Sequence, residues 1–109
     1  MTSASAYLDE TQAPSRAELD VLPGLTLLEF GTDWCGHCRT AQPARAEALS
    51  TLAGWRHLKV EDGPGRALGR SFRVKLWPTV VVLREGLEVA RVVRPSQASD
   101  ITSLMRKAM

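Results

Sequence analysis

Residues 34–38 read Trp-Cys-Gly-His-Cys and contain both cysteines of this 109-residue chain. A short apolar run at residues 25–30 precedes this motif and is bounded by glycines, which predicts a buried strand. Good helix formers dominate residues 39–49. The cysteines are therefore expected at a strand-to-helix junction, with Cys35 near the N-terminus of the helix.

Such a junction favours an ionised sulfur at Cys35. Unpaired backbone N–H groups and the positive end of the helix dipole stabilise a negative charge there. Such sites lower the pKa of a cysteine thiol from its usual value of about 8.5, and the thiolate is the form that attacks disulfides. Cys38 follows one helical turn later, where it can attack a mixed disulfide formed at Cys35. The pair therefore predicts reversible dithiol–disulfide exchange.

A metal site and a structural disulfide are the alternative interpretations of this pair. Zinc needs four protein ligands, or three in a catalytic site. The only other soft ligands are His37, inside the motif, and His57, in a separate predicted strand. A disulfide across so short a loop constrains the unfolded chain little. The spacing therefore favours redox chemistry, and we expect neither a metal nor an organic cofactor.

From about residue 7 to residue 109, the chain resembles the thioredoxin superfamily. The 34–38 motif after a strand carries the resemblance, together with Trp77-Pro78-Thr79, which is similar to the family's cis-proline loop. Pro43, five residues after Cys38, matches the proline that kinks the family's active-site helix. The resemblance implies the thioredoxin fold within the α/β class. We expect a central mixed β-sheet, with parallel strands and a C-terminal antiparallel hairpin, flanked by helices on both faces in a single domain at residues 1–109.

Local patterns supply the expected elements. Ser15 and Glu18 have capping-box spacing, which predicts a short first helix. A short edge strand is expected at residues 7–9, and strands are expected at 25–31, 55–60, 79–84 and 87–93. Three more helices are predicted: the active-site helix at 36–53, a basic helix at 66–72 with Ala67, Leu68 and Phe72 inward, and a final helix capped by Ser96 or Ser99, with Ile101, Leu104, Met105 and Ala108 on one face.

Glu29 is a carboxylate within the apolar strand. An unpaired buried charge is costly, so this group should have a raised pKa or a partner. It stands six residues before Cys35, as does the family's buried acid, and the resemblance implies that it moves the proton of Cys38. Lys59 aligns with the lysine that pairs with this acid. The alternative is that Glu29 faces solvent at a strand end and that Lys59 lies on an exposed face.

The resemblance also assigns residues to substrate binding. It implies a cis bond before Pro78, and backbone hydrogen bonds from the residues around it, Trp77 and Thr79 among them, to an extended substrate. The alternative is an ordinary proline that opens an edge strand. Trp34 is expected to pack beside the cysteines and to form part of the docking surface.

Gly36 and His37 between the cysteines are the pattern of protein disulfide isomerase domains, whereas thioredoxin usually has proline in place of His37. A protonated imidazole near Cys35 stabilises the thiolate. Since a better-stabilised reduced form makes the disulfide a stronger oxidant, we expect a protein more oxidising than ordinary thioredoxin.

Composition argues against several classes of partner. A net charge of +2 implies no strong attraction to nucleic acid or membranes, and no apolar run approaches the length of a membrane span. Residues 1–6 lack the basic start and apolar core of a signal peptide, which favours the cytoplasm. The basic cluster Arg66, Arg70, Arg73 and Lys75 is read as a solvated face, with a docking site for an acidic partner as the alternative.

Together these features predict a monomeric, thioredoxin-like thiol–disulfide oxidoreductase. Cys35 attacks the disulfides of protein substrates and Cys38 resolves the mixed disulfide. By analogy with the family, a thioredoxin reductase supplies the electrons. Two alternatives remain open: a more oxidising disulfide oxidase or isomerase, and a non-catalytic binding or chaperone module with the same fold.

Overall fold

Four strands form a mixed sheet in the order β2-β1-β3-β4 in the computed structural model, which describes residues 6–109. The central strand β1 (Leu25–Gly31) pairs in parallel with β2 (Trp55–Glu61) and antiparallel with β3 (Thr79–Arg84). β4 (Leu87–Val93) completes an antiparallel hairpin with β3. This is the α/β sheet that the resemblance implied.

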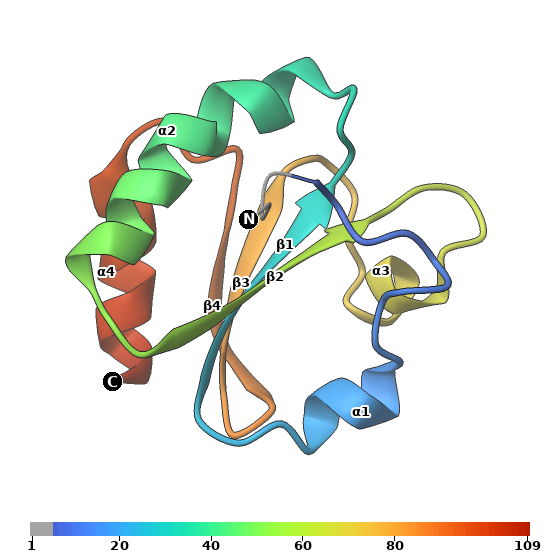
Figure 1. Cartoon of the computed structure of the whole chain (residues 1–109), viewed down its shortest axis with the longest axis horizontal. Helices are drawn as coiled ribbons and strands as arrows, with labels where there is room; N and C mark the ends of the chain where they lie inside the picture. The colour runs from blue at the N-terminus through green and yellow to red at the C-terminus, as the bar shows by residue number, and fades with distance from the viewer. Residues whose placement is uncertain (1–5) are drawn as a thin grey trace.

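Two layers of helices cover the sheet (Figure 1). α2 (Gly36–Thr51) and α4 (Ala98–Ala108) pack on one face, and α1 (Arg16–Asp20) and α3 (Ala67–Ser71) lie on the other. The active-site helix α2 ends two residues earlier than predicted. No helix among residues 6–109 is long and apolar enough to cross a membrane.

β1 is buried on both faces, which explains why nearly all of its residues are apolar. Side chains alternate between the two faces of a strand. Leu27 therefore joins the core beneath α2 and α4, and Leu28 joins the core beneath α1 and α3. Because neither face meets water, the strand is almost continuously apolar, and the same alternation puts Glu29 and Gly31 on the α2 side.

The first and third helices follow the predictions in part. The capping box of α1 is confirmed, since Ser15 and Glu18 exchange backbone-to-side-chain hydrogen bonds of 2.8 and 3.1 Å. In the shorter α3, Leu68 and Phe72 are buried as expected. Ala67, however, is exposed at the first position of α3.

The predicted cap of the last helix was wrong. Ile101, Leu104, Met105 and Ala108 are buried as expected, but the N-cap is Gln97 rather than a serine. The carboxylate of Asp100 accepts hydrogen bonds from the backbone N–H groups of Ser96 and Gln97 at 2.9 and 3.1 Å. These donors belong to the cap residue and the residue before it, whereas a serine N-cap would accept an N–H from inside the first turn. The first-turn acid, and not a serine hydroxyl, therefore fixes the start of this helix.

The edge strand predicted at residues 7–9 is reduced to a single parallel bridge between Leu8 and Val60. Its two backbone hydrogen bonds join Leu8 to Lys59 and Glu61 at 2.7 and 2.8 Å. The Asp9 carboxylate then accepts N–H groups of the following residues and turns the chain away from the sheet. This short bridge still fixes Tyr7 against the end of β2.

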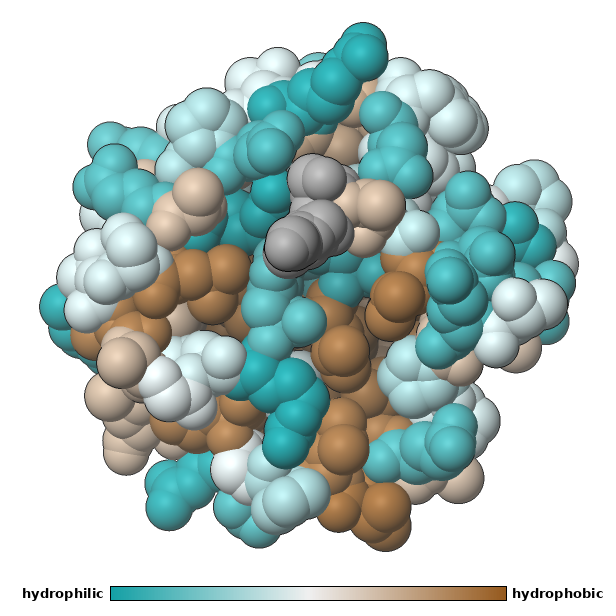
Figure 2. Space-filling view, in the orientation of Figure 1, coloured by the Kyte–Doolittle hydropathy of each residue, from teal (hydrophilic) through white to brown (hydrophobic). Residues whose placement is uncertain are grey.

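On the surface, apolar residues form patches between hydrophilic side chains on the face seen in Figure 2. Among the large apolar side chains that are exposed, Trp34 and Leu76 belong to the segments next to the cysteines and the cis-proline loop. Of the remaining ones, Leu87, Val89 and Val93 lie on the edge strand β4, and Val21 and Met109 follow α1 and α4.

Candidate active site

Cys35 and Cys38 lie where the chain turns from β1 into α2, and both are free thiols. Cys35 is the N-cap of the helix, and its Sγ accepts the backbone N–H of Cys38 at 3.3 Å. A hydrogen-bond donor and a helix N-terminus both favour negative charge on this sulfur. The placement predicted from the sequence is therefore observed.

The two sulfurs differ in their surroundings. Cys35 is 7% exposed and Cys38 is 3% exposed. Burial raises the pKa of the Cys38 thiol to about 11, and a hydrogen bond with Cys35 acts in the same direction. Cys38 is thus the inner thiol and is protonated at neutral pH in the reduced protein.

A tryptophan pair and a cis-proline border the dithiol. The Trp77–Pro78 peptide bond is cis, as the resemblance implied. Trp77 packs against the cluster of Tyr7 and the two cysteines, and its ring meets Trp34 edge-on with centroids 5.7 Å apart. Trp34 is 70% exposed, so it offers an apolar surface beside the cysteines.

Hydrogen bonds from two other segments hold the cis-proline loop. The Trp77 indole N–H donates to Asp62 at 2.9 Å, and the Trp77 carbonyl accepts from Arg94 Nε at 2.8 Å. Arg94 also donates its backbone N–H to the Pro78 carbonyl at 2.8 Å. Thr79 is buried and its hydroxyl donates to the Leu76 carbonyl at 2.6 Å, within the same loop.

Sequence reasoning assigned no role in the site to Asp62 or Arg94. Arg94 has a φ of 53°, in the left-handed region where glycine is usual, and this angle is visible only in the structure. Gly36 and His37, by contrast, are both exposed, on the outer side of the motif.

Glu29 is 1% exposed, so the alternative that it faces solvent is wrong. Arg45 Nη1 donates to both of its carboxylate oxygens at 3.0 and 2.9 Å, and the Tyr7 hydroxyl donates to Oε2 at 2.5 Å. His57 Nε2 lies 3.6 Å from Oε1, too far for a hydrogen bond. Burial by itself raises the pKa of Glu29, but His57, Arg45 and Tyr7 together outweigh burial and lower it. Glu29 is therefore a buried carboxylate.

Lys59 is also buried, so the exposed-face alternative is wrong for it too. It stands opposite Glu29 in the register of β1 and β2, and its Nζ lies 4.3 Å from the centroid of the Tyr7 ring. Burial, followed by the positive charge of Arg45, lowers the pKa of Lys59. The lysine is thus buried on the strand next to the acid, and its pairing with the acid remains a prediction.

The sequence analysis missed Tyr7 and Arg45. A signal for Arg45 was present, because it lies seven residues after Cys38, on the buried stripe that includes Ala41 and Ala48. A charged residue on such a stripe needs a buried partner. For Tyr7 there was no local signal, since its place depends on the single bridge that Leu8 makes with β2.

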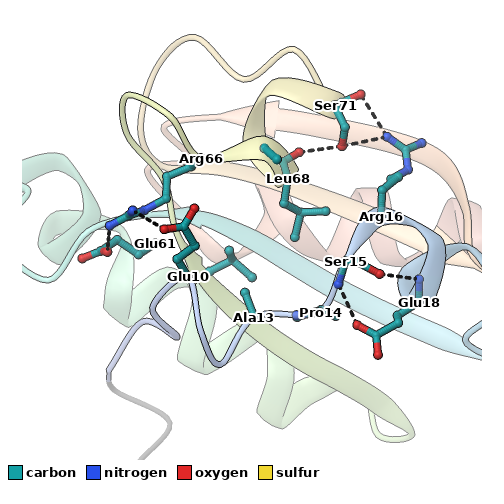
Figure 3. Close-up of a pocket in the computed structure, with 12 residues that line it drawn as sticks. Glu10, Ala13, Pro14, Ser15, Arg16, Glu18, Glu61, Arg66, Leu68 and Ser71 are labelled. Atoms are coloured by element: carbon teal, nitrogen blue, oxygen red, sulfur yellow. Dashed lines mark hydrogen bonds and ion pairs between the residues drawn. The ribbon is translucent and has the colours of Figure 1, made fainter.

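A cavity of about 140 Å³ opens beside Cys38 and is lined by Tyr7, Thr32, Asp33, Arg39, Gln42, Arg45 and Lys59 as well. A larger cavity of about 420 Å³ lies between α1 and α3 (Figure 3) and includes none of these residues. In that cavity Arg66 bridges Glu10 and Glu61. Among residues 6–109 there is no group of three or more His, Cys, Asp or Glu side chains that could hold a metal ion.

Known proteins resemble this chain along most of its length. The thioredoxin family model matches residues 11–107. The structure of thioredoxin 2 from Pseudomonas aeruginosa PAO1 in its reduced form superposes with a TM-score of 0.80, at 61% identity, over 94% of this chain and 92% of that one.

Two curated relatives extend this comparison. Protein disulfide-isomerase A3 of Gallus gallus is 31% identical over 95% of this chain, and Thioredoxin H2-1 of Oryza sativa subsp. japonica is 33% identical over 63% of it. This chain spans only 21% and 50% of those two proteins. A dithiol at the start of a helix, a cis-proline beside it and the match to the family model lead to one conclusion: the chain belongs to the thioredoxin family.

Proposed function

We propose that this protein reduces disulfides in protein substrates through Cys35 and Cys38. The Cys35 thiolate attacks a substrate disulfide, a mixed disulfide forms, and one substrate thiolate leaves. Cys38 then attacks the Cys35 sulfur, so that the Cys35–Cys38 disulfide forms and the second substrate thiolate leaves. The dithiol loses two electrons and the substrate disulfide gains them.

One observation carries this proposal: Cys35 Sγ accepts the Cys38 N–H at the helix N-terminus, next to the cis Trp77–Pro78 bond. This arrangement supports a stabilised attacking sulfur with a second thiol directly behind it. We assign Trp34, Trp77, Pro78 and Thr79 to the surface that binds the substrate chain. Glu29 and Lys59 act behind Cys38, and the ion pair with Arg45 makes Glu29 a fixed charge rather than a group that takes up a proton.

By analogy with its relatives, the protein works as a cytoplasmic monomer, and a thioredoxin reductase returns it to the dithiol form. Insulin disulfide reduction, followed with and without a thioredoxin reductase and its reductant, tests this role. Cys35→Ser should abolish turnover, and Cys38→Ser should accumulate a mixed disulfide with the substrate. If the double variant Cys35→Ser and Cys38→Ser kept full biological activity, the protein would instead be a binding or chaperone module.

A more oxidising role is the second candidate, and the exposed His37 within the motif favours it, together with the similarity to Protein disulfide-isomerase A3. Thioredoxin has a reduction potential of about −270 mV and protein disulfide isomerase one of about −180 mV. We expect a value between these two, and His37→Pro should shift it downward. A potential at or below that of thioredoxin would rule out the oxidising role and leave the reductase role intact.

A further inference from the structure

The hydroxyl of Tyr7 lies between the two ionisable groups buried behind Cys35. It donates to Glu29 Oε2 at 2.5 Å, and Tyr7 belongs to the buried cluster of the two cysteines. A Cβ placed on Gly31 would come within 2.5 Å of Cys38 Sγ and 2.8 Å of the Tyr7 oxygen. The hydroxyl and the thiol therefore face the same small space, which only a glycine at position 31 leaves free.

Tyr7 is not the only partner of the Glu29 carboxylate. Arg45 Nη1 donates to both carboxylate oxygens, so Glu29 keeps a charged partner when the Tyr7 hydroxyl turns away. Burial, followed by the negative charge of Glu29, raises the pKa of Tyr7. The phenol therefore keeps its proton and acts as a donor throughout the working pH range.

We propose that the Tyr7 hydroxyl is a switchable hydrogen-bond donor, which binds Glu29 while Cys38 is a thiol and turns to the Cys38 sulfur when that sulfur ionises in the resolving step. This inference rests on the proposed function. The Cys38 proton leaves to solvent through the cavity of about 140 Å³ that Tyr7, Cys38 and Lys59 line. The Cys38 thiolate then attacks Cys35 in the mixed disulfide, and the substrate thiolate leaves.

The charges around Cys38 explain why this donor matters. Burial raises the pKa of Cys38, and a hydrogen bond donated by the nearby Tyr7 hydroxyl would act in the opposite direction. The titratable and charged groups around Tyr7 and Cys38 are Cys35, Glu29, His57, Lys59, Arg45 and Arg39, with Asp33 beside the backbone of Tyr7. Without the hydroxyl, a Cys38 thiolate would lose its neutral donor while the Glu29 carboxylate remained behind it.

The reactions of the two sulfurs can be followed separately by stopped flow, with an aromatic disulfide that releases a coloured thiolate at each step. The first equivalent reports attack by Cys35, and the second reports resolution by Cys38. In Tyr7→Phe we expect the second phase to slow about tenfold at neutral pH, because the variant loses one hydrogen bond to a charged group. Its pH midpoint should rise while the first phase is unchanged.

Thr32→Val is the matched control, because Thr32 lines the same cavity and its hydroxyl hydrogen-bonds to none of the described residues. It should leave both phases unchanged. An unaltered second phase in Tyr7→Phe, or an equal slowing of both phases, would overturn the role of Tyr7. If the unmodified protein released no first equivalent, the proposed function itself would fail.

The chain has one tyrosine, which allows a second test that keeps the shape of the ring. Replacing tyrosine with fluorotyrosine during expression changes position 7 alone and makes the phenol a stronger donor. The pH midpoint of the second phase should then fall, opposite to the shift in Tyr7→Phe. The fluorine NMR signal should also titrate together with Cys38, and a signal that does not respond to Cys38 ionisation would contradict the switch.

Discussion

The two ends of the contact between β1 and α2 have opposite character, although they share one strand face and one helix (Figure 1). At the lower end Leu27 packs with Ala44 and Ala48 in an apolar core. Two residues further along β1, Glu29 meets Arg45, and the next residue on that face, Gly31, adjoins Cys38. The backbone geometry is the same, but the side chains change from apolar to ionisable.

This difference separates stability from reactivity within a single interface. Burying apolar groups at the lower end stabilises the fold. Burying an ion pair at the upper end costs desolvation energy, which the attraction between the charges only partly offsets. The upper end therefore contributes little net stability but sets the charge and space around the inner sulfur. Variants at each end should separate the two roles.

The largest effect is expected from Arg45→Leu, which leaves the Glu29 carboxylate buried without its charged partner. We expect a loss of about 3–5 kcal/mol in the free energy of unfolding at pH 7, measured by urea denaturation. The double variant with Glu29→Gln should recover much of this loss. If Arg45→Leu lowered the free energy of unfolding by less than about 1 kcal/mol, the Glu29–Arg45 ion pair would not be needed to keep the buried carboxylate in the native state.

The same variant has a predictable pH dependence. The folded-state pKa of Glu29 lies below its unfolded value, so the carboxylate stabilises the native protein above the unfolded pKa. That contribution is lost as the pH falls through the folded pKa. The difference in the free energy of unfolding between the unmodified protein and Arg45→Leu should therefore become smaller at acid pH.

At the lower end, Leu27→Ala should cost about 3 kcal/mol through lost burial and the cavity that it leaves. Leu27 is fully buried among apolar side chains, so this cost should not change between pH 4 and pH 8. Insulin reduction per folded molecule should stay unchanged. If the stability cost of Leu27→Ala changed strongly with pH, the apolar end of the interface would not be independent of the ionisable end.

Gly31→Ala adds one methyl group at the upper end and should cost about 1–3 kcal/mol, because the new Cβ overlaps Cys38 Sγ and the Tyr7 oxygen. Thermal unfolding of the reduced protein measures this cost. Gly36→Ala is the matched control, since a Cβ there meets nothing within 4 Å. Equal destabilisation by both variants would show that the crowding at Gly31 is not responsible.

The smallest effect concerns the reduced protein at alkaline pH. The folded-state pKa of Cys38 is about 11, above the unfolded value, so folding favours the protonated thiol. This stabilisation is present below the unfolded pKa and is lost as the pH rises toward 11. Between pH 8 and pH 11, the free energy of unfolding should fall further for the reduced protein than for Cys38→Ala. Urea titrations that give parallel curves of this free energy against pH for the two proteins would exclude the effect.

Local pattern was enough to predict most elements. Periodicity and turn residues gave the bounds of β1, β3 and β4, because a buried strand and a tight hairpin leave their signature in neighbouring residues. The predicted cap of α4 was wrong because Gln97 takes the N-cap position and the Asp100 carboxylate accepts the N–H groups of Ser96 and Gln97, an arrangement that residue spacing alone does not decide. The site was predicted where it follows the motifs, as at Cys35 and Pro78.

The amino-acid sequence by itself determined that two cysteines would sit at the start of a helix behind a buried strand, since those relations span only adjacent residues. Only the tertiary structure decided which groups surround Glu29 and Cys38. Tyr7 and Arg45 come from separate segments, and they meet because the Leu8 bridge and the packing of α2 on β1 bring them together. Long-range contacts of this kind depend on how whole elements pack, so no local pattern encodes them.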